Sequence, residues 1–291
     1  MEQKISKIAI GSAQFGLHYG LTNTFGVTPA KEVLNILTFA KKNGIKVIDT
    51  AILYGESETV LGQCDVSDFE VITKISFQKI QKSDIRKYLY DSLIGSINRL
   101  KVNKLGGVLF HNSKDLLGKD GEFIFENLSN LKKDGMLEKI GISAYETPDV
   151  EEVINRFDID IVQAPLNIFD RRFEESGLIQ KCQTKKIEFH ARSIFLQGLL
   201  INPRIQNPYF GKWKNLLTEF NNILIDNDID PIQACLSYPL SISGVSKIII
   251  GIESLTHLEQ IINIPSKEID MVLFNNFSTN DKELINPTYW K

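Results

Sequence analysis

Short runs of β-branched and other apolar residues recur along the whole chain, and most of them are followed by a segment with helical spacing. These runs cover residues 8–11, 47–49, 71–74, 108–111, 140–143, 159–162, 187–190 and 247–250. Continuous apolar runs of this length are typical of parallel strands buried on both faces, because helices cover both sides of such a sheet. The alternation therefore predicts a parallel sheet with helical crossovers.

Four of the intervening segments carry clear helix signals. Helices are predicted over residues 29–42, 83–101, 115–133 and 148–156. Thr28 and Thr147 are candidate N-caps, and each precedes a proline that fits the first turn of a helix. The pairs Asn43-Gly44 and Asp134-Gly135 are typical helix stops.

Eight strands joined by helices predict an α/β fold, the (β/α)8 TIM barrel, as a single domain over residues 1–291. The alternative is an open doubly wound sheet, which usually needs fewer strands. It is weakened because no G-x-G-x-x-G motif follows the first strand. The longest gap, residues 193–245, predicts a long loop over 202–211 and an extra helix before the eighth strand.

The overall composition excludes several classes of protein. A net charge of −3 gives no electrostatic reason to expect nucleic acid or an anionic membrane as partner. No apolar run reaches the roughly 18 residues that span a bilayer, and the first residues lack the pattern of a signal peptide. The cysteines Cys64, Cys182 and Cys235 are widely spaced and suit neither a metal site nor a disulfide framework. We therefore expect a cytoplasmic protein with a small-molecule partner.

Polar side chains end three consecutive predicted strands. Asp49, Lys74 and His111 close the second, third and fourth strands, and Tyr54 follows Asp49 in the next loop. Each has an ordinary structural explanation: a turn-forming Asp, an exposed Lys, a core His, a packed Tyr. In an α/β barrel, however, the carboxyl ends of the strands meet at one mouth, where chemistry is carried out. Their joint placement therefore favours a shared catalytic site.

These four side chains suit proton transfer to a carbonyl oxygen. A free phenol has a pKa of about 10 and is a weak acid at neutral pH. A buried ammonium beside a phenol lowers that pKa, and a carboxylate keeps the ammonium charged when both are buried. A histidine can donate a hydrogen bond that orients the carbonyl oxygen. The set predicts Tyr54 as acid, Lys74 as activator, Asp49 as counter-ion and His111 as the orienting group.

The segment over residues 47–58 contains Asp49 followed by Tyr54-Gly55-Glu56-Ser57-Glu58, and it resembles the aldo-keto reductase signature. Lys74 after Thr73 and His111 after Phe110 resemble the family's other two catalytic positions. The resemblance extends over nearly the whole chain. It implies a TIM barrel, a nicotinamide cofactor and hydride transfer from that cofactor to an aldehyde or ketone.

The resemblance also implies a set of cofactor-binding residues. Ser143 and Gln163 would meet the carboxamide, and the segment from Ser193 through Gly198 would hold the pyrophosphate. The full set is Ser143, Gln163, Arg192, Ser193, Leu196, Gln197, Gly198, Gly251, Glu253, Ser254 and His257. No metal is implied.

Two of these positions depart from the family pattern. Arg192 stands where many relatives stack an aromatic ring on the nicotinamide, and a planar guanidinium can also stack. Glu253 lies near the adenosine end, where members that prefer NADP supply basic residues. NADP is the expectation from the family, and NAD is the alternative, because a carboxylate repels a 2′-phosphate and accepts from a ribose hydroxyl.

The candidate substrate residues are Phe15, His18, Tyr19, Phe169 and Arg171, which follow the first and sixth strands. Polar aromatic residues and an arginine suit a polyhydroxylated or anionic substrate. The segment from His190 to Gly198 resembles a bacterial branch of the family found with surface-polysaccharide genes. This resemblance suggests the carbonyl group of a sugar or nucleotide sugar.

Two other functions remain open at this point. Some relatives act mainly as cofactor-binding, redox-sensing subunits of larger assemblies, and this chain could do the same with weak catalysis. Alternatively, Lys74 at its strand end could form a Schiff base, as in an aldolase. The resemblance to a pyrophosphate-binding segment argues against the aldolase.

Overall fold

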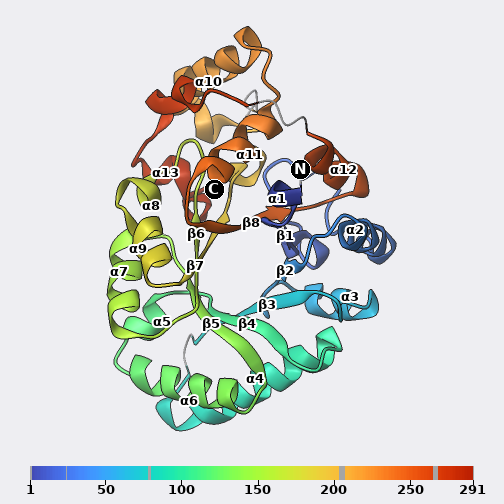
Figure 1. Ribbon diagram of the computed structural model, residues 1–291, viewed down its shortest axis with the longest axis vertical. Coiled ribbons are helices and arrows are strands. Elements are labelled where there is room, and N and C mark those ends of the chain that lie inside the picture. The colour runs from blue at the N-terminus through green and yellow to red at the C-terminus, as the bar shows by residue number, and fades with distance from the viewer. Residues whose placement is uncertain (1, 24, 78–79, 203–206, 265–267, 291) are drawn as a thin grey trace.

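A computed structural model describes residues 2–23, 25–77, 80–202, 207–264 and 268–290, and its strands form a closed parallel barrel (Figure 1). The strands follow one another in chain order around the barrel, and β1 pairs with β8 to close it. They are β1 (Ile8–Gly11), β2 (Val47–Asp49), β3 (Glu70–Ile75), β4 (Leu105–Phe110), β5 (Leu137–Ser143), β6 (Ile161–Pro165), β7 (Glu188–Arg192) and β8 (Val245–Gly251). The predicted (β/α)8 barrel is confirmed.

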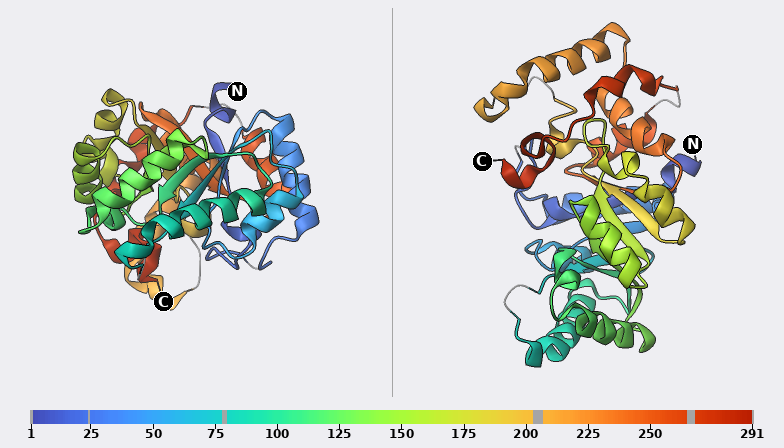
Figure 2. Two further views of the ribbon diagram at one scale, coloured as in Figure 1. Left: turned by 90° about the horizontal axis from the view of Figure 1, so that it is seen from below. Right: turned by 90° about the vertical axis from the view of Figure 1, so that its left-hand side faces the viewer.

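Helices surround the strands, as Figures 1 and 2 show. They are α1 (Glu2–Ile5), α2 (Ala30–Lys42), α3 (Ser57–Gln63), α4 (Ile85–Leu100), α5 (Lys114–Leu117), α6 (Gly121–Lys133), α7 (Thr147–Arg156), α8 (Arg172–Glu175), α9 (Leu178–Thr184), α10 (Lys214–Asp226), α11 (Pro231–Ser241), α12 (Leu255–Asn263) and α13 (Lys282–Ile285). The predicted insertion before the last strand consists of α10 and α11, and part of its loop, residues 203–206, lies outside the described residues. Among the described helices, none has the length and apolar character needed to cross a membrane.

Four local predictions need correction. Strands β6 and β7 begin later than predicted, and the predicted helix over 115–133 is two helices, α5 and α6. The chain turns so tightly there that a side chain at Gly121 would lie 1.8 Å from the carbonyl oxygen of Leu116. Thr28 does not cap α2: its hydroxyl donates to the carbonyl oxygen of Glu253, which follows the neighbouring strand β8. Thr147 is the first residue of α7 rather than its cap.

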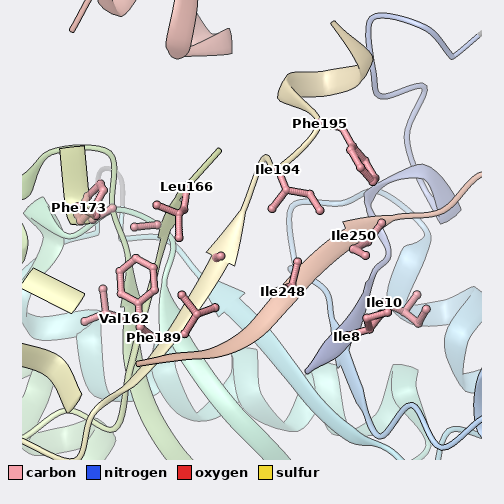
Figure 3. Packing of buried hydrophobic residues seen from close by; sticks show 14 of the residues in the cluster. Ile8, Ile10, Val162, Leu166, Phe173, Phe189, Ile194, Phe195, Ile248 and Ile250 are labelled. Carbon is pink, nitrogen blue, oxygen red and sulfur yellow. The ribbon is translucent and has the colours of Figure 1, made fainter. Parts of the chain in front are cut away.

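The core has two layers, because side chains of a strand alternate between its faces. Ala9, Val47, Ile72, Leu109, Ile161 and Ile249 form a separate cluster of buried residues from six different strands. Their neighbours in the strands, such as Ile8, Ile10, Ile248 and Ile250, belong to the larger cluster between strands and helices, part of which Figure 3 shows. The barrel interior is therefore filled by side chains, and a site must lie beyond this layer.

A charged network ties three strands together. Lys139 of β5 lies 2.7 Å from both Glu70 of β3 and Glu188 of β7. The buried ring of His190 donates from Nε2 to Glu188 at 2.9 Å. These contacts, first the hydrogen bond from His190 and then Lys139, hold the pKa of the Glu188 carboxyl at about 2. The charged carboxylate is thus favoured in the folded barrel.

This lowered pKa predicts an acid-dependent contribution to stability. A carboxyl whose pKa is lower in the folded state stabilises it above the unfolded pKa, near 4.5, and loses that effect as the pH falls towards about 2. We expect Glu188→Gln to destabilise the barrel at pH 7, and we expect this difference from the unaltered protein to shrink strongly by pH 2, where the carboxyl is about half protonated in the folded state. Urea unfolding at both pH values measures this, with Glu152→Gln, on an exposed ion pair, as the control. A difference that does not change with pH would contradict it.

Candidate active site

A cavity of about 440 Å³ lies beyond the carboxyl ends of the strands. Its volume falls within the range of small-molecule and cofactor sites. The lining includes residues from the end of nearly every strand or the segment after it: Gly11, Asp49, Tyr54, Lys74, His111, Ser143, Gln163, Arg192 and Gly251. The position agrees with the expectation for a barrel enzyme.

Strand periodicity explains how these side chains come together. The buried layer inside the barrel contains Val47, Ile72 and Leu109. The residues two positions further along are Asp49, Lys74 and His111, and they therefore continue on the same inward face. Asp49 and Ile72 are register partners, so that Lys74 lies one layer nearer the mouth than Asp49. Three neighbouring strands thus bring a carboxylate, an ammonium and an imidazole to one cavity.

Asp49 and Lys74 form a buried ion pair. Nζ of Lys74 lies 2.6 Å from Oδ2 of Asp49 and also donates to the carbonyl oxygen of Thr50 at 3.0 Å. The side chains are only 1% and 5% exposed, so water does not screen the pair. Burial alone lowers the pKa of Lys74, but Asp49 and the Tyr54 hydroxyl outweigh it, and the pKa is raised. Lys74 is therefore a cation at neutral pH.

The ammonium of Lys74 also reaches the phenol. Nζ lies 3.4 Å from the Tyr54 hydroxyl and 5.0 Å from the centre of its ring. The ring of His111 meets the Tyr54 ring edge-on, with centres 5.9 Å apart. Burial and the nearby Lys74 lower the pKa of His111 to about 4, so the imidazole is neutral at pH 7. The structure brings all four predicted catalytic residues together.

Gln163 is the second partner of the Asp49 carboxylate. Its Nε2 donates to Oδ1 of Asp49 at 2.7 Å, while Lys74 occupies Oδ2. Both carboxylate oxygens are thus engaged, and the orientation of Asp49 is fixed. Gln163 and the nearby Ser143 both line the cavity.

The segment after β7 has an unusual backbone. Ser193, Leu196 and Gln197 have φ angles of 57°, 48° and 52°, in the left-handed region that non-glycine residues seldom adopt. Gln197 accepts a hydrogen bond from the backbone N–H of Leu21 and donates from Nε2 to the Tyr19 hydroxyl at 3.2 Å. This segment therefore lies against the β1 loop at the cavity wall.

Gly198 makes the closest approach between these two loops. A Cβ at this position would lie 2.1 Å from the Thr22 hydroxyl, and its φ of 95° also favours glycine. Ser193, Gln197 and Gly198 line the cavity, whereas Leu196 is fully buried and does not. The segment predicted to bind the pyrophosphate thus forms part of the cavity wall and is packed tightly against the loop after β1.

Arg192 lies over the ring of Tyr145, a residue that the sequence did not single out. The guanidinium carbon is 4.0 Å from the centre of the Tyr145 ring. One terminal nitrogen donates to the carbonyl oxygen of Ala144 at 3.1 Å, and the other lies 3.3 Å from the Ser193 hydroxyl. Both Arg192 and Tyr145 line the cavity. The position of Tyr145 directly after the strand-end Ser143-Ala144 was the available signal for it.

The wall after β8 is acidic. Gly251, Glu253 and His257 line the cavity, while Ser254 caps α12 by accepting from the backbone N–H of His257. Burial raises the pKa of Glu253 and lowers that of His257. Glu32, from α2, accepts a hydrogen bond from the backbone N–H of Leu255 at 2.7 Å. A carboxylate therefore already occupies the N-terminus of α12.

The predicted substrate residues separate into two groups. Tyr19 lines the cavity, and the ring of His18 in the same loop is exposed and bonded to the carbonyl oxygen of Asn23. The expectation that Phe15, Phe169 and Arg171 rim the mouth does not match their positions, since none of them lines the cavity.

These three residues have structural partners instead. Phe15 is fully buried in the core. Phe169 is also fully buried and packs against Phe220 and Phe277, with ring centres 5.3 and 5.7 Å apart. Arg171 donates to the carbonyl oxygen of Phe274. The loop after β6 is therefore packed against α10 and the segment over 271–277 and does not face the cavity.

Three buried polar atoms on the cavity wall have no hydrogen-bond partner among the described residues. They are Oε1 of Gln14, Nδ1 of His111 and Nε2 of His257. Buried polar atoms without partners are costly, and native proteins pair nearly all of them. The side chains that carry these atoms line the cavity, so a polar ligand bound there would lie beside them. The polar side chains of Ser143 and Gln163 and the segment from Ser193 to Gly198, all at one cavity, fit a nicotinamide dinucleotide.

The chain matches the model of the Aldo/keto reductase family over residues 7–276. The chain belongs to this family. Members of the family use NAD(P)H in general, and membership supports carbonyl reduction as the reaction. Related oxidoreductases in Bacillus subtilis support the same class of enzyme.

Two of those relatives are informative. The uncharacterised oxidoreductase YqkF is 23% identical over 283 residues, which cover 88% of this chain and 86% of YqkF. The glyoxal reductase of the same organism is 27% identical over 192 residues, which cover 64% of this chain and 66% of that protein. Both support an oxidoreductase.

Solved structures agree on the fold. An aldo-keto reductase from Bacillus halodurans, in its holo form, superposes with a TM-score of 0.73 at 18% identity, covering 94% of this chain and 92% of its own. A putative aldo-keto reductase from Pseudomonas aeruginosa gives a TM-score of 0.66 at 20% identity, with 88% of each chain covered.

The buried ion pair at the site predicts strong coupling between its two members. Removing one partner leaves the other charge buried without compensation, which costs about 3–5 kcal/mol. We expect Asp49→Asn and Lys74→Met each to lower the free energy of unfolding by about this amount. The double variant should be more stable than the sum of the two losses implies. Urea unfolding of all four proteins measures the coupling, and strictly additive losses would show that the pair is not coupled.

Proposed function

We propose that the chain is an NAD(P)H-dependent reductase of an aldehyde or ketone, with Tyr54 as the general acid. The observation that carries this proposal is the Lys74 ammonium, which is held by Asp49 and directed at the Tyr54 hydroxyl. An aldolase would need a neutral amine at Lys74, whereas the buried contact with Asp49 keeps it charged.

A dihydronicotinamide, when bound, supplies the hydride for such a reaction. The protein's own residues then complete it. Tyr54 gives its proton to the carbonyl oxygen as negative charge develops there. Lys74 stabilises the phenolate that remains, and Asp49 keeps the ammonium charged. His111, neutral at pH 7, is able to donate a hydrogen bond to the carbonyl oxygen and orient it.

Ser143 and Gln163 are the proposed partners of the carboxamide, and the Ser193–Gly198 segment that of the pyrophosphate. The adenosine end would meet Gly251, Ser254 and His257. Support comes from the single cavity that contacts most of these residues and from the unpartnered atom of His257. The free state of all three cysteines is compatible with the cytoplasm that the sequence predicts.

The choice between NADP and NAD depends on the wall after β8. The family resemblance implies NADP. Glu253 on this wall counts against a 2′-phosphate because its carboxylate repels one. Glu32 also counts against it, because it already accepts from the N-terminus of α12, and helix N-termini bind phosphate only where their N–H groups are free. We therefore propose that NADH binds at least as tightly as NADPH.

Titration of the protein with NADH and NADPH, followed by its tryptophan fluorescence, tests this choice. The Glu253→Gln variant should improve NADPH binding by about 2- to 5-fold, the size expected for a partly exposed charge, and leave NADH binding little changed. Glu259→Gln is a matched control, because this half-buried carboxylate lies on α12 but does not line the cavity. Much tighter binding of NADPH by the unaltered protein would contradict the choice of NAD. Failure to bind either dinucleotide would contradict the whole proposed function.

A single atom tests the proposed acid. Tyr54→Phe keeps the ring but removes the hydroxyl, so carbonyl reduction should fall by about 10²- to 10⁴-fold while dinucleotide affinity stays nearly the same. Stopped-flow oxidation of bound NAD(P)H measures the step, and Tyr90→Phe, on an exposed tyrosine, is the control. Retained reduction in Tyr54→Phe would show that another group supplies the proton. Tight binding without reduction in the unaltered protein would favour the cofactor-binding regulatory subunit.

For the substrate, we propose a polar carbonyl compound such as a sugar or nucleotide sugar. The polar wall near Tyr54 supports this proposal: Tyr19, Tyr145, Arg192 and Thr288 all line the cavity. The resemblance to the branch found with surface-polysaccharide genes points in the same direction.

A further inference from the structure

Arg192 is a cation on the cavity wall without a carboxylate partner among the described residues. It donates hydrogen bonds to the carbonyl oxygen of Ala144 and to the Ser193 hydroxyl, which are both neutral oxygens. The guanidinium also lies over the Tyr145 ring, with its carbon 4.0 Å from the ring centre. A partly buried cation is normally paired with an anion, because neutral groups compensate poorly for lost hydration.

The nearby carboxylates are engaged elsewhere. Asp49 is held by Lys74 and Gln163. Asp170, which also interacts with the charge of Arg192, accepts two hydrogen bonds from Arg172, both at 2.8 Å. Lys74 and Asp49 cancel, and His111 is neutral at pH 7. The reaction side of the cavity therefore carries one uncompensated positive charge, that of Arg192.

We propose that Arg192 binds a carboxylate of the substrate, so that the carbonyl compound reduced here carries an acidic group. The planar guanidinium presents paired N–H donors that match a carboxylate in geometry and charge. This inference rests on the proposed carbonyl reduction and narrows its substrate class. The acidic group completes the charge balance of the site.

The pyrophosphate of the dinucleotide is a second anionic group that could bind Arg192. The position of Arg192 favours the substrate, because the hydroxyls of Tyr19, Tyr54 and Tyr145 all lie close enough to act on its charge. Tyr54 is the proposed proton donor, and Arg192 lines the same cavity. The backbone of the Ser193–Gly198 segment is the separate, neutral surface available to the pyrophosphate.

Matched ligands test the proposal without relying on turnover. Binding of benzoate and of benzamide to the protein saturated with NAD⁺ is measured by calorimetry. Benzoate should bind about 10- to 100-fold more tightly, the range expected for a hydrogen-bonded charge pair. In Arg192→Gln this preference should disappear, and in Arg192→Lys it should be reduced. Arg156→Gln, on an exposed ion pair, should keep the preference unchanged. Equal binding of the two ligands by the unaltered protein overturns the proposal.

Turnover of 4-carboxybenzaldehyde and 4-formylbenzamide gives the second readout. The acid should be reduced with a lower KM than the amide, and Arg192→Gln should raise the KM for the acid about 10- to 100-fold and so remove the difference between the two aldehydes, whereas Arg156→Gln should keep it. The affinity of each variant for NADH, from fluorescence, distinguishes the two anionic groups. A loss of NADH affinity in Arg192→Gln with no change in the acid preference would assign Arg192 to the dinucleotide, at its nicotinamide or its pyrophosphate, and overturn the proposal. If neither aldehyde is reduced although benzoate binds through Arg192, the proposed function fails while the anion site stands.

Discussion

The buried ion pair of Lys74 and Asp49 is the interaction on which the site depends. Two charges that are almost wholly removed from water are stable only with excellent geometry and with their remaining hydrogen bonds satisfied. The structure meets this requirement with the carbonyl oxygen of Thr50 on the ammonium and the amide of Gln163 on the carboxylate. Gln163 comes from β6, on another side of the barrel from β2 and β3, so only a closed barrel can deliver it.

The same periodicity that builds the core also builds the site, and this is why so much could be predicted from sequence. Val47, Ile72 and Leu109 fill the barrel, and two residues further on the side chains become Asp49, Lys74 and His111. An apolar strand that ends in a charged residue is visible in sequence, and the parallel order of the strands places these ends at one mouth. The fold and the four clustered side chains followed from that pattern alone.

Contacts between distant segments were not predictable in this way. Tyr145 beneath Arg192 and Glu32 at the start of α12 are set by packing between elements far apart in the chain. The sequence likewise gave no means of telling an aromatic residue at the mouth from one in the core. Phe169 was expected at the mouth, but α10 supplies Phe220, and the ring is buried against it. The wall between the catalytic residues and solvent is therefore the part that only tertiary structure defines.

The charges of that wall are unequal along the cavity. After β7 the wall carries the cation Arg192, and after β8 it carries the carboxylate of Glu253. Hydride transfer carries one negative charge from the dinucleotide to the carbonyl group of the substrate. The electric field across the site therefore acts on both the dinucleotide and the substrate. A substrate acid bound to Arg192 leaves Lys74 and the Tyr54 hydroxyl as the groups that meet the developing oxyanion. On this proposal, only a substrate with a carboxylate neutralises the charge of Arg192. Binding of the correct substrate therefore also sets the electric field in which the carbonyl oxygen becomes negative.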